Sequence, residues 1–328
     1  MNSAIALRTK TEINREALSN GQRSELVKKI YEGKTVQKVL SWQAEDGYFN
    51  ERMHTPVSNS KSWSQEGCMR FLMELGLSVE DEPIRRAIPA MIKPDWGREL
   101  NAVKSVAAES FGYGIIRAAL FAQAGLHYYE FVPYWIDLSL HAFRCIAETA
   151  DYHELIEEYR NKYVFREGKE LPNIYHMRIL AFTQSWRTQS NLRMLQKAYQ
   201  KLYEQLPLPP IYIKAKSQLV APAFTIAQPY NQDFSGENAY LWLQFYELNA
   251  RMGMLHAGSP FYSHYNALTN ELAANGEEIL DKVDKRGFFQ YSGYSGMALS
   301  DDWRRIEQKR DDLMFRIRLI DAYTKGYE

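Results

Sequence analysis

The chain has 328 residues, of which 45% are hydrophobic and 24% charged, an ordinary composition for a globular protein. Basic and acidic residues both number 40, so the formal net charge is zero, which indicates neither a nucleic-acid surface nor a polybasic membrane anchor. Two cysteines in so long a chain do not make a disulfide framework, and no stretch of 18 residues is uninterruptedly apolar. We therefore expect a cytoplasmic protein without integral membrane association.

In chain order, amphipathic helices suited to a surface are predicted at residues 24–31, 82–92, 132–148, 190–204 and 263–275. Between and after them lie five mostly apolar stretches that look like versions of one unit, at residues 63–77, 111–126, 173–182, 239–254 and 312–323. Few runs alternate with a period of two, so we expect an all-α fold and little sheet.

A helix that is apolar nearly all round belongs inside, whereas an amphipathic helix belongs at a surface. Their alternation predicts an inner and an outer ring, which together form an (α/α) toroid or barrel of about five to six helix hairpins. We expect this toroid to be a single domain over residues 1–328. The proline-rich insertion at residues 207–235 is unsuited to a helix and is interpreted as a lid or plug over one rim.

A turn of recognisable sequence, Gln43-Ala-Glu-Asp46-Gly47-Tyr-Phe49, precedes the first inner helix, and Asp284-Lys-Arg-Gly287-Phe-Phe289 is a weaker copy. It resembles the Gln-x-x-Asp-Gly-x-Trp turn of the terpenoid cyclase and protein prenyltransferase β-subunit superfamily, and more narrowly that of bacterial prenyltransferase-like toroid proteins. The resemblance implies an α-toroid with a small-molecule ligand in its lumen. In such a turn we expect the glycine to allow a tight backbone, the aromatic ring to pack under an outer helix, and the Gln and Asp side chains to tie down helix ends.

The motifs that carry the chemistry of this superfamily are missing. The nearest match to an Asp-x-Asp-Asp motif is Ser300-Asp301-Asp302-Trp303, which lacks the first Asp. Asp311 and Asp312 resemble the start of an aspartate-rich helix, but Phe315 occupies the position where such a helix needs a third Asp. No Cys and His spacing marks a zinc site. We therefore predict no cofactor and no metal ligands, although Mg and Zn stay open. His141 and the two cysteines, Cys68 and Cys145, are assigned to structure.

Arginine recurs at one position of the apolar units, as Arg70, Arg117, Arg178 and Arg316, with Gln244 in the fourth unit. If this position faces the lumen, a ring of guanidinium groups suits a carboxylate, phosphate or diphosphate. The alternative is that each arginine pairs with a nearby acid. Glu66 stands four residues before Arg70, and Asp312 four before Arg316, as such pairing requires.

Acids and a histidine around a cationic pocket can supply a general acid and base. The catalytic candidates are Glu66, His176, Asp301, Asp302 and Asp312. The candidates for substrate binding are His54, Trp63, Arg70, Tyr113, Arg117, Tyr175, Arg178, Tyr240, Tyr246 and Arg316. Asp301 and Asp302 fit equally well at a helix N-terminus, where an aspartate accepts hydrogen bonds from free amides.

Three functions remain open on these grounds. The first is a prenyltransferase-like or terpenoid-cyclase-like toroid that binds an elongated apolar substrate with an anionic end. The second is an (α/α)6-barrel carbohydrate hydrolase or lyase acting on uronate-containing sugars, with Glu66 and Asp312 as the carboxylate pair. The third is a non-catalytic binding or scaffold protein. The sequence predicts neither the oligomeric state nor the substrate.

Overall fold

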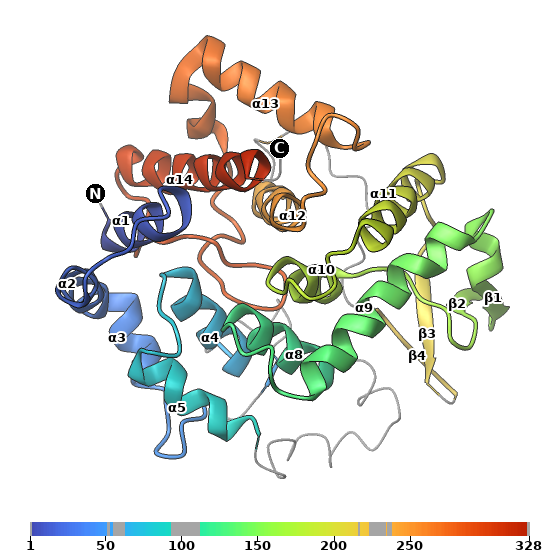
Figure 1. The fold of residues 1–328 in the computed structure, drawn as a ribbon, viewed down its shortest axis with the longest axis horizontal. Coiled ribbons are helices and arrows are strands. Elements are labelled where there is room, and N and C mark those ends of the chain that lie inside the picture. The colour runs from blue at the N-terminus through green and yellow to red at the C-terminus, as the bar shows by residue number, and fades with distance from the viewer. Residues whose placement is uncertain are drawn as a thin grey trace. The chain divides into compact units, whose positions relative to one another are not determined.

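The computed structural model describes residues 2–50, 53–54, 63–92, 112–215, 217–222, 234 and 238–326. These residues form twelve α-helices and one small four-stranded sheet, so the fold is mostly helical, as expected (Figure 1). The chain divides into two compact units, which are described separately. Unit 1 comprises residues 1–96, 232–250 and 264–328, and unit 2 comprises residues 97–231 and 251–263. A closed toroid in a single domain stays a prediction.

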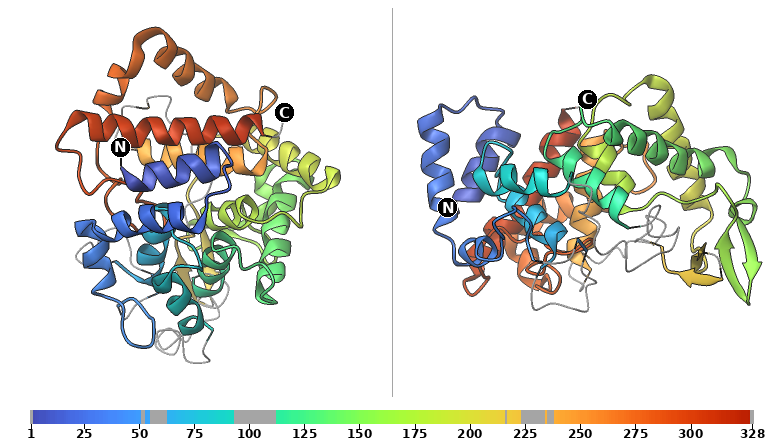
Figure 2. Two further views of the ribbon diagram at one scale, coloured as in Figure 1. Left: turned by 60° about the vertical axis from the view of Figure 1, so that its left-hand side comes forward. Right: turned by 90° about the horizontal axis from the view of Figure 1, so that it is seen from below.

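Unit 1 brings together helices from the two ends of the chain. Its elements are α1 (Ser3–Arg8), a π-helical turn (Thr9–Ile13), α2 (Asn20–Tyr31), α3 (Lys34–Leu40), α4 (Gln65–Glu74), α5 (Glu82–Ala90), α12 (Ala239–Met252, up to residue 250), α13 (Tyr262–Asn275, from residue 264), a 3-10 helix (Gly276–Lys282) and α14 (Ile306–Lys325). In Figures 1 and 2, α1 lies beside α14. Helix α1 lies before the first helix predicted from the sequence, and its residues Ala4, Ile5 and Leu7 are buried.

The local sequence explains where these helices begin. Ser19 and Gln22 form a reciprocal capping box, so α2 begins earlier than the predicted residue 24. Ser64 caps α4 by accepting a hydrogen bond from the Gly67 amide. All ten residues of α4 are buried, as expected of an inner helix, although four of them are polar or charged.

The turn at Gln43–Phe49 has most of the expected geometry. Gly47 has a φ of +92°, and a Cβ there would lie 2.1 Å from the carbonyl oxygen of Arg86, so only glycine fits. Phe49 is fully buried. Gln43 donates to the Pro83 carbonyl in α5 at 2.8 Å, whereas Asp46 accepts from the Tyr48 amide within its own turn instead of reaching a helix end.

The proposed copy at residues 284–289 is a different turn. Gly287 is also left-handed, with a φ of +78°, but the hydrogen bond that closes this turn runs from the Phe288 amide to the Lys285 carbonyl. In the first turn the corresponding bond ends on the glycine itself, from the Gly47 amide to the Ala44 carbonyl. The fully buried ring of Phe288 directly follows the glycine here, whereas Tyr48 separates Gly47 from the buried ring of Phe49.

The described residues of unit 2 form four α-helices and the sheet. Its elements are α8 (Tyr113–Gln123), α9 (Phe131–Glu148), a 3-10 helix (Tyr152–Leu155), β1 (Ile156–Tyr159), β2 (Lys162–Phe165), α10 (Ile174–Ala181), α11 (Gln189–Glu204), β3 (Ile211–Ala215) and β4 (Gln218–Val220). Every residue of α10 is buried. Helix α9 packs against α10 and α11, with the rings of Phe143 and Tyr199 5.5 Å apart.

The small amount of sheet in the described residues lies in unit 2, where β1 to β4 form one sheet in that order (Figure 2, right). β1 and β2 pair antiparallel, β2 and β3 parallel, and β3 and β4 antiparallel. The strands span only three to five residues and include charged side chains, so they leave little periodic signal in the sequence. β3 and β4 lie in the insertion 207–235, whose residues 216, 223–233 and 235 lie outside the described part.

Within the described residues, every helix is too short or too polar to cross a bilayer.

Candidate functional site

A histidine and a buried glutamate meet at the N-terminal end of α4 in unit 1. The Glu66 amide donates to the carbonyl of Met53 at 3.1 Å, which holds residues 53–54 against the start of the helix. His54 Nδ1 then lies 2.8 Å from Glu66 Oε2. The Glu66 side chain is 1% exposed, whereas that of His54 is 26% exposed. The sequence predicts both residues as site candidates, and the fold brings them into contact.

This pair has the geometry of an oriented general base. The first turn of a helix stabilises negative charge, so α4 favours the ionised form of Glu66. A carboxylate that accepts Nδ1–H selects the imidazole tautomer whose other nitrogen, Nε2, carries the lone pair. Because Nδ1 and Nε2 lie on opposite sides of the ring, the basic nitrogen of His54 points away from Glu66. The pair can therefore accept and return a proton at Nε2.

An aromatic cluster lies at the start of the same helix, and one further ring contacts His54. Trp63 lies 5.1 Å from Phe71 and 5.3 Å from Tyr291 between ring centroids, and Tyr294 lies 6.3 Å from His54. Gly67 allows this packing, because a Cβ there would lie 2.4 Å from the Tyr291 carbonyl oxygen. The sequence singles out Trp63 but not the two tyrosines, although both belong to its glycine-rich run at residues 291–296.

Arg70 holds the loop that carries these tyrosines. Its Nη1 donates to the carbonyls of Ser292 and Ser295, the second at 2.9 Å, and the side chain is buried. The predicted pairing with Glu66, four residues earlier, is replaced by these two carbonyls. Arg70 therefore fixes the loop next to His54 instead of presenting its charge to a ligand.

Arg316 belongs to a buried charge network. Its Nη1 lies 2.7 Å from Glu74 and 3.1 Å from Glu247, and Arg8 reaches Glu74 at 2.9 Å. The interpretation that the arginine pairs with acids is confirmed for Arg316, but its partners come from α4 and α12 and not from Asp312 on its own helix. Although burial opposes it, the charges of Arg316 and Arg8 lower the pKa of Glu74 to about 2.

The three candidate aspartates near the C-terminus hold backbone groups. Asp312 is 2% exposed and accepts hydrogen bonds from the Leu299 and Ser300 amides, the Ser300 hydroxyl and the Trp303 indole. Asp301 accepts from the amides of Lys34 at 3.1 Å and Thr35 at 2.9 Å, so it caps the first turn of α3.

Asp302 is an exposed residue that accepts from the Arg304 amide and pairs with the Arg304 guanidinium at 3.3 Å. The alternative interpretation of the aspartate pair, as caps of a helix N-terminus, therefore describes Asp301 and not Asp302.

Two further candidates in unit 1 pack as aromatic side chains. Tyr246 is fully buried, with its ring 4.0 Å from Trp242 and 5.6 Å from Tyr265. Tyr240 is half-buried and lies against Gly287, where a Cβ would come within 2.3 Å of its ring.

Two of the four arginines belong to unit 2. Arg117 is half-buried, with its guanidinium carbon 4.0 Å from the centre of the Phe131 ring, and burial lowers its pKa. Arg178 is buried and lies 5.6 Å from the ring centre of Tyr175, which is also buried. Tyr113 is half-buried at the start of α8. A common ring of four arginines stays a prediction.

His176 lies in an environment that keeps it neutral. It is 1% exposed, and its Nδ1 accepts from the Asn173 amide in the cap of α10. Burial lowers the pKa of His176 to about 3, with a contribution from His141. Its Nε2 lies 3.8 Å from Glu170, a residue that the sequence does not single out, and burial raises the pKa of Glu170 to about 7. At neutral pH, Glu170 is thus the group of this pair that exchanges protons.

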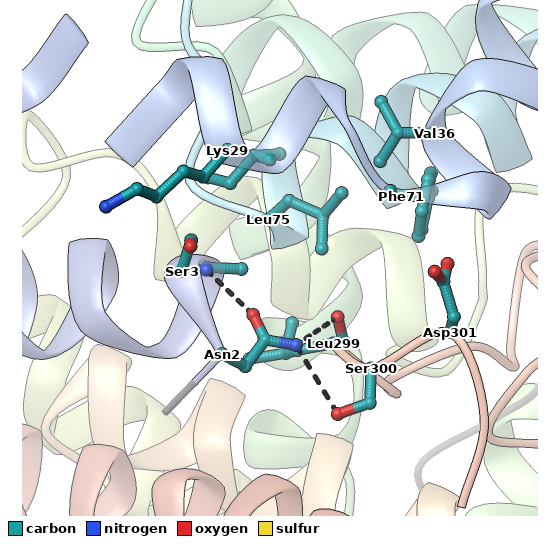
Figure 3. A pocket seen from close by; sticks show the side chains of 12 residues that line it. Asn2, Ser3, Lys29, Val36, Phe71, Leu75, Leu299, Ser300 and Asp301 are labelled. Carbon is teal, nitrogen blue, oxygen red and sulfur yellow. Dashed lines mark hydrogen bonds between the residues drawn. The ribbon is translucent and has the colours of Figure 1, made fainter. Parts of the chain in front are cut away.

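A cavity of about 170 Å³ lies next to the loop that Asp312 holds (Figure 3). Ile30, Val36, Phe71 and Leu75 form its apolar wall, and Asn2 bridges to the Leu299 carbonyl and the Ser300 hydroxyl at the rim. Phe71 therefore separates this cavity from the aromatic cluster around Trp63.

Among the described residues, no group of three or more His, Cys, Asp or Glu side chains is placed to hold a metal ion. Comparison with family models, with curated proteins and with solved structures finds no match for this chain.

Proposed function

We propose that this protein is an enzyme in which His54 and Glu66 act as a coupled general base and acid on an elongated, largely apolar substrate with an anionic end. The observation that carries the proposal is the 2.8 Å contact between His54 Nδ1 and the buried Glu66 carboxylate. A buried carboxylate that orients a partly exposed imidazole is the arrangement that proton transfer needs.

The apolar part of the substrate is supported by the rings beside this pair. Trp63, Phe71 and Tyr291 contact one another, and Tyr294 reaches His54. Aromatic rings pack against apolar chains and stabilise positive charge that develops in a hydrocarbon. Trp63 and Tyr294 are half-buried and are the rings of this group that a substrate can contact, whereas Phe71 and Tyr291 are buried behind them. The Gln43–Phe49 turn, which resembles that of the terpenoid cyclase and prenyltransferase superfamily, points to the same class of substrate.

The anionic end requires a cationic partner. Arg70 and Arg316 are engaged by carbonyls and carboxylates, so neither supports that role well. The glycoside-cleaving alternative has less support, because the Asp312 carboxylate already accepts four hydrogen bonds.

The test is a thermal-shift screen of the protein against prenyl diphosphates, uronates and oligosaccharides, followed by detection of products from each stabilising compound by mass spectrometry. We expect a prenyl diphosphate to stabilise the protein. His54→Ala and Glu66→Gln should retain binding but lose turnover by about 100-fold or more.

A matched control is available at the surface. His153 lies 2.5 Å from Asp151, and both side chains are more than half exposed, so His153→Ala removes a histidine–carboxylate pair away from the proposed site. It should leave turnover unchanged. Stabilisation by uronates or oligosaccharides alone would overturn the substrate class, and full turnover in Glu66→Gln would overturn the role of the pair. Binding without turnover in the parent would identify a non-catalytic binding protein.

A further inference from the structure

Three potential metal ligands converge in unit 2, and none of them belongs to the proposed function. His141 and Cys145 are four residues apart on α9, so their side chains share one face of the helix. His141 Nε2 lies 3.4 Å from Cys145 Sγ. The carbonyl oxygen of Gly168, in the loop after β2, lies 2.9 Å from the same nitrogen and 3.9 Å from the sulfur.

These distances match the ligand face of a zinc site. A triangle with edges of 2.9, 3.4 and 3.9 Å has a centre about 2.0 Å from all three corners. Zinc binds nitrogen and oxygen at about 2.0–2.2 Å and thiolate sulfur at about 2.3 Å. An ion slightly above the centre of this triangle therefore reaches all three atoms without movement of the backbone.

The hydrogen bonds of this cluster converge on one point. When Nε2 of His141 carries a proton, both this N–H and the thiol of Cys145 donate to the carbonyl oxygen of Gly168. A cation bound to the lone pairs of the three atoms takes the place of these two hydrogens.

We propose that His141, Cys145 and the Gly168 carbonyl bind a zinc ion. Binding breaks the S–H bond of Cys145, forms a sulfur–zinc bond and releases the proton to solvent. His141 binds through Nε2 as neutral imidazole.

The surroundings leave room for a fourth ligand. A cavity of about 180 Å³ adjoins the pair and is lined by Glu148 and Glu154 as well as by Arg144 and Lys169, so its charges balance. Glu148 lies three residues after Cys145 on the same helix, is 71% exposed and contacts Arg144 only at 4.0 Å, so a side-chain rotation can bring it to the ion. The C-terminal end of α9 adds a negative partial charge that favours a cation.

The site would tie the end of α9 to the loop after β2, so zinc should stabilise unit 2. The test uses Co²⁺ as a spectroscopic probe for zinc in the full chain. We expect a near-ultraviolet thiolate-to-cobalt band that Zn²⁺ abolishes by displacement. Cys145→Ala should remove this band, and His141→Ala should weaken Co²⁺ binding by about tenfold or more.

The chain supplies its own control, because Cys68 is the other cysteine and lies in unit 1. Cys68→Ala should keep the band. Cys145 is the one cysteine left in this variant, so its alkylation can be measured directly, and Zn²⁺ should slow it. This measurement leaves the proposed ligands His141 and Cys145 unsubstituted. The absence of a band in the parent, its loss in Cys68→Ala, its persistence in Cys145→Ala, or unchanged affinity in His141→Ala would each overturn the proposal.

Discussion

Arg316 of α14 lies 2.7 Å from Glu74 of α4, and both side chains are buried. Arg8 and Glu247 complete the network, so α1, α4, α12 and α14 are joined by ion pairs within unit 1. Removing one member of a buried pair leaves the opposite charge uncompensated in a medium that solvates it poorly.

We therefore expect Glu74→Gln to lower the free energy of unfolding by about 3 kcal/mol, measured by urea denaturation. Glu25→Gln is the control, because its pair with Lys29 is exposed and should contribute nothing measurable. Equal effects of the two substitutions would contradict a structural role for the network.

The same glutamate should make unit 1 sensitive to acid. Its pKa in the folded protein is about 2, below its ordinary value of 4.5, so its contribution to stability is complete above pH 4.5 and disappears as the pH falls toward 2. The difference in melting temperature between the parent and Glu74→Gln should shrink over this range. A constant difference across it would show that ionised Glu74 does not stabilise the fold.

Glu170 should have the opposite pH dependence. Its pKa rises from 4.5 to about 7 on folding because it is partly buried, so the folded state holds a proton that the unfolded chain releases in this interval. Its contribution to stability therefore falls as the pH rises from 4.5 to 7. Glu170→Gln should raise the melting temperature at pH 8 relative to the parent, by roughly 2 °C, but not at pH 4. Glu167→Gln, an exposed change in the same loop, should alter neither value.

Gly47 tests the tight turn before α4. Gly47→Ala introduces both a left-handed alanine and an overlap with the Arg86 carbonyl, whereas Gly125→Ala at a φ of +77° meets no atom within 4 Å. We expect Gly125→Ala to cost about 1 kcal/mol and Gly47→Ala about 3 kcal/mol, measured by urea denaturation. Similar costs would mean that the turn can move away from α5.

Asp312 tests whether a candidate acid serves structure. Asp312→Asn places an amide group among donors, so we expect faster hydrogen exchange at the Leu299 and Ser300 amides and a loss of about 1–3 kcal/mol in the free energy of unfolding. Asp302→Asn, in the same loop but exposed, should change neither. If hydrogen exchange at these two amides is unchanged in Asp312→Asn, Asp312 does not hold the loop and becomes a catalytic candidate again.

Local patterns in the sequence predict much of this fold. The helices expected at residues 82–92, 132–148, 190–204 and 263–275 appear as α5, α9, α11 and α13, with ends that differ by at most two residues. Their positions depend on the spacing of apolar residues along one segment, which the sequence displays directly. Helix α1 spans six residues and the strands three to five, which is too short for such a pattern.

The site was predictable only where its residues are neighbours in sequence. His54, Trp63 and Glu66 lie within one short segment, and their common position at the start of α4 follows from the predicted helix. The partners of Arg70 and Arg316 come from distant segments, and Glu74 is separated from Arg316 by 242 residues. Sequence spacing reveals acids on the same helix, so it suggested Glu66 and Asp312 as the partners instead.

The cap of α3 has a consequence for the order of synthesis. Asp301 is made more than 260 residues after the amides of Lys34 and Thr35 that it binds, and Arg316 comes later still. Helices α1 to α5 therefore leave the ribosome without the contacts that complete their packing. Most of unit 2, by contrast, is one continuous stretch from residue 97 to 231. Its helices and sheet can therefore pack before the C-terminal residues that contact the early helices of unit 1 have been synthesised.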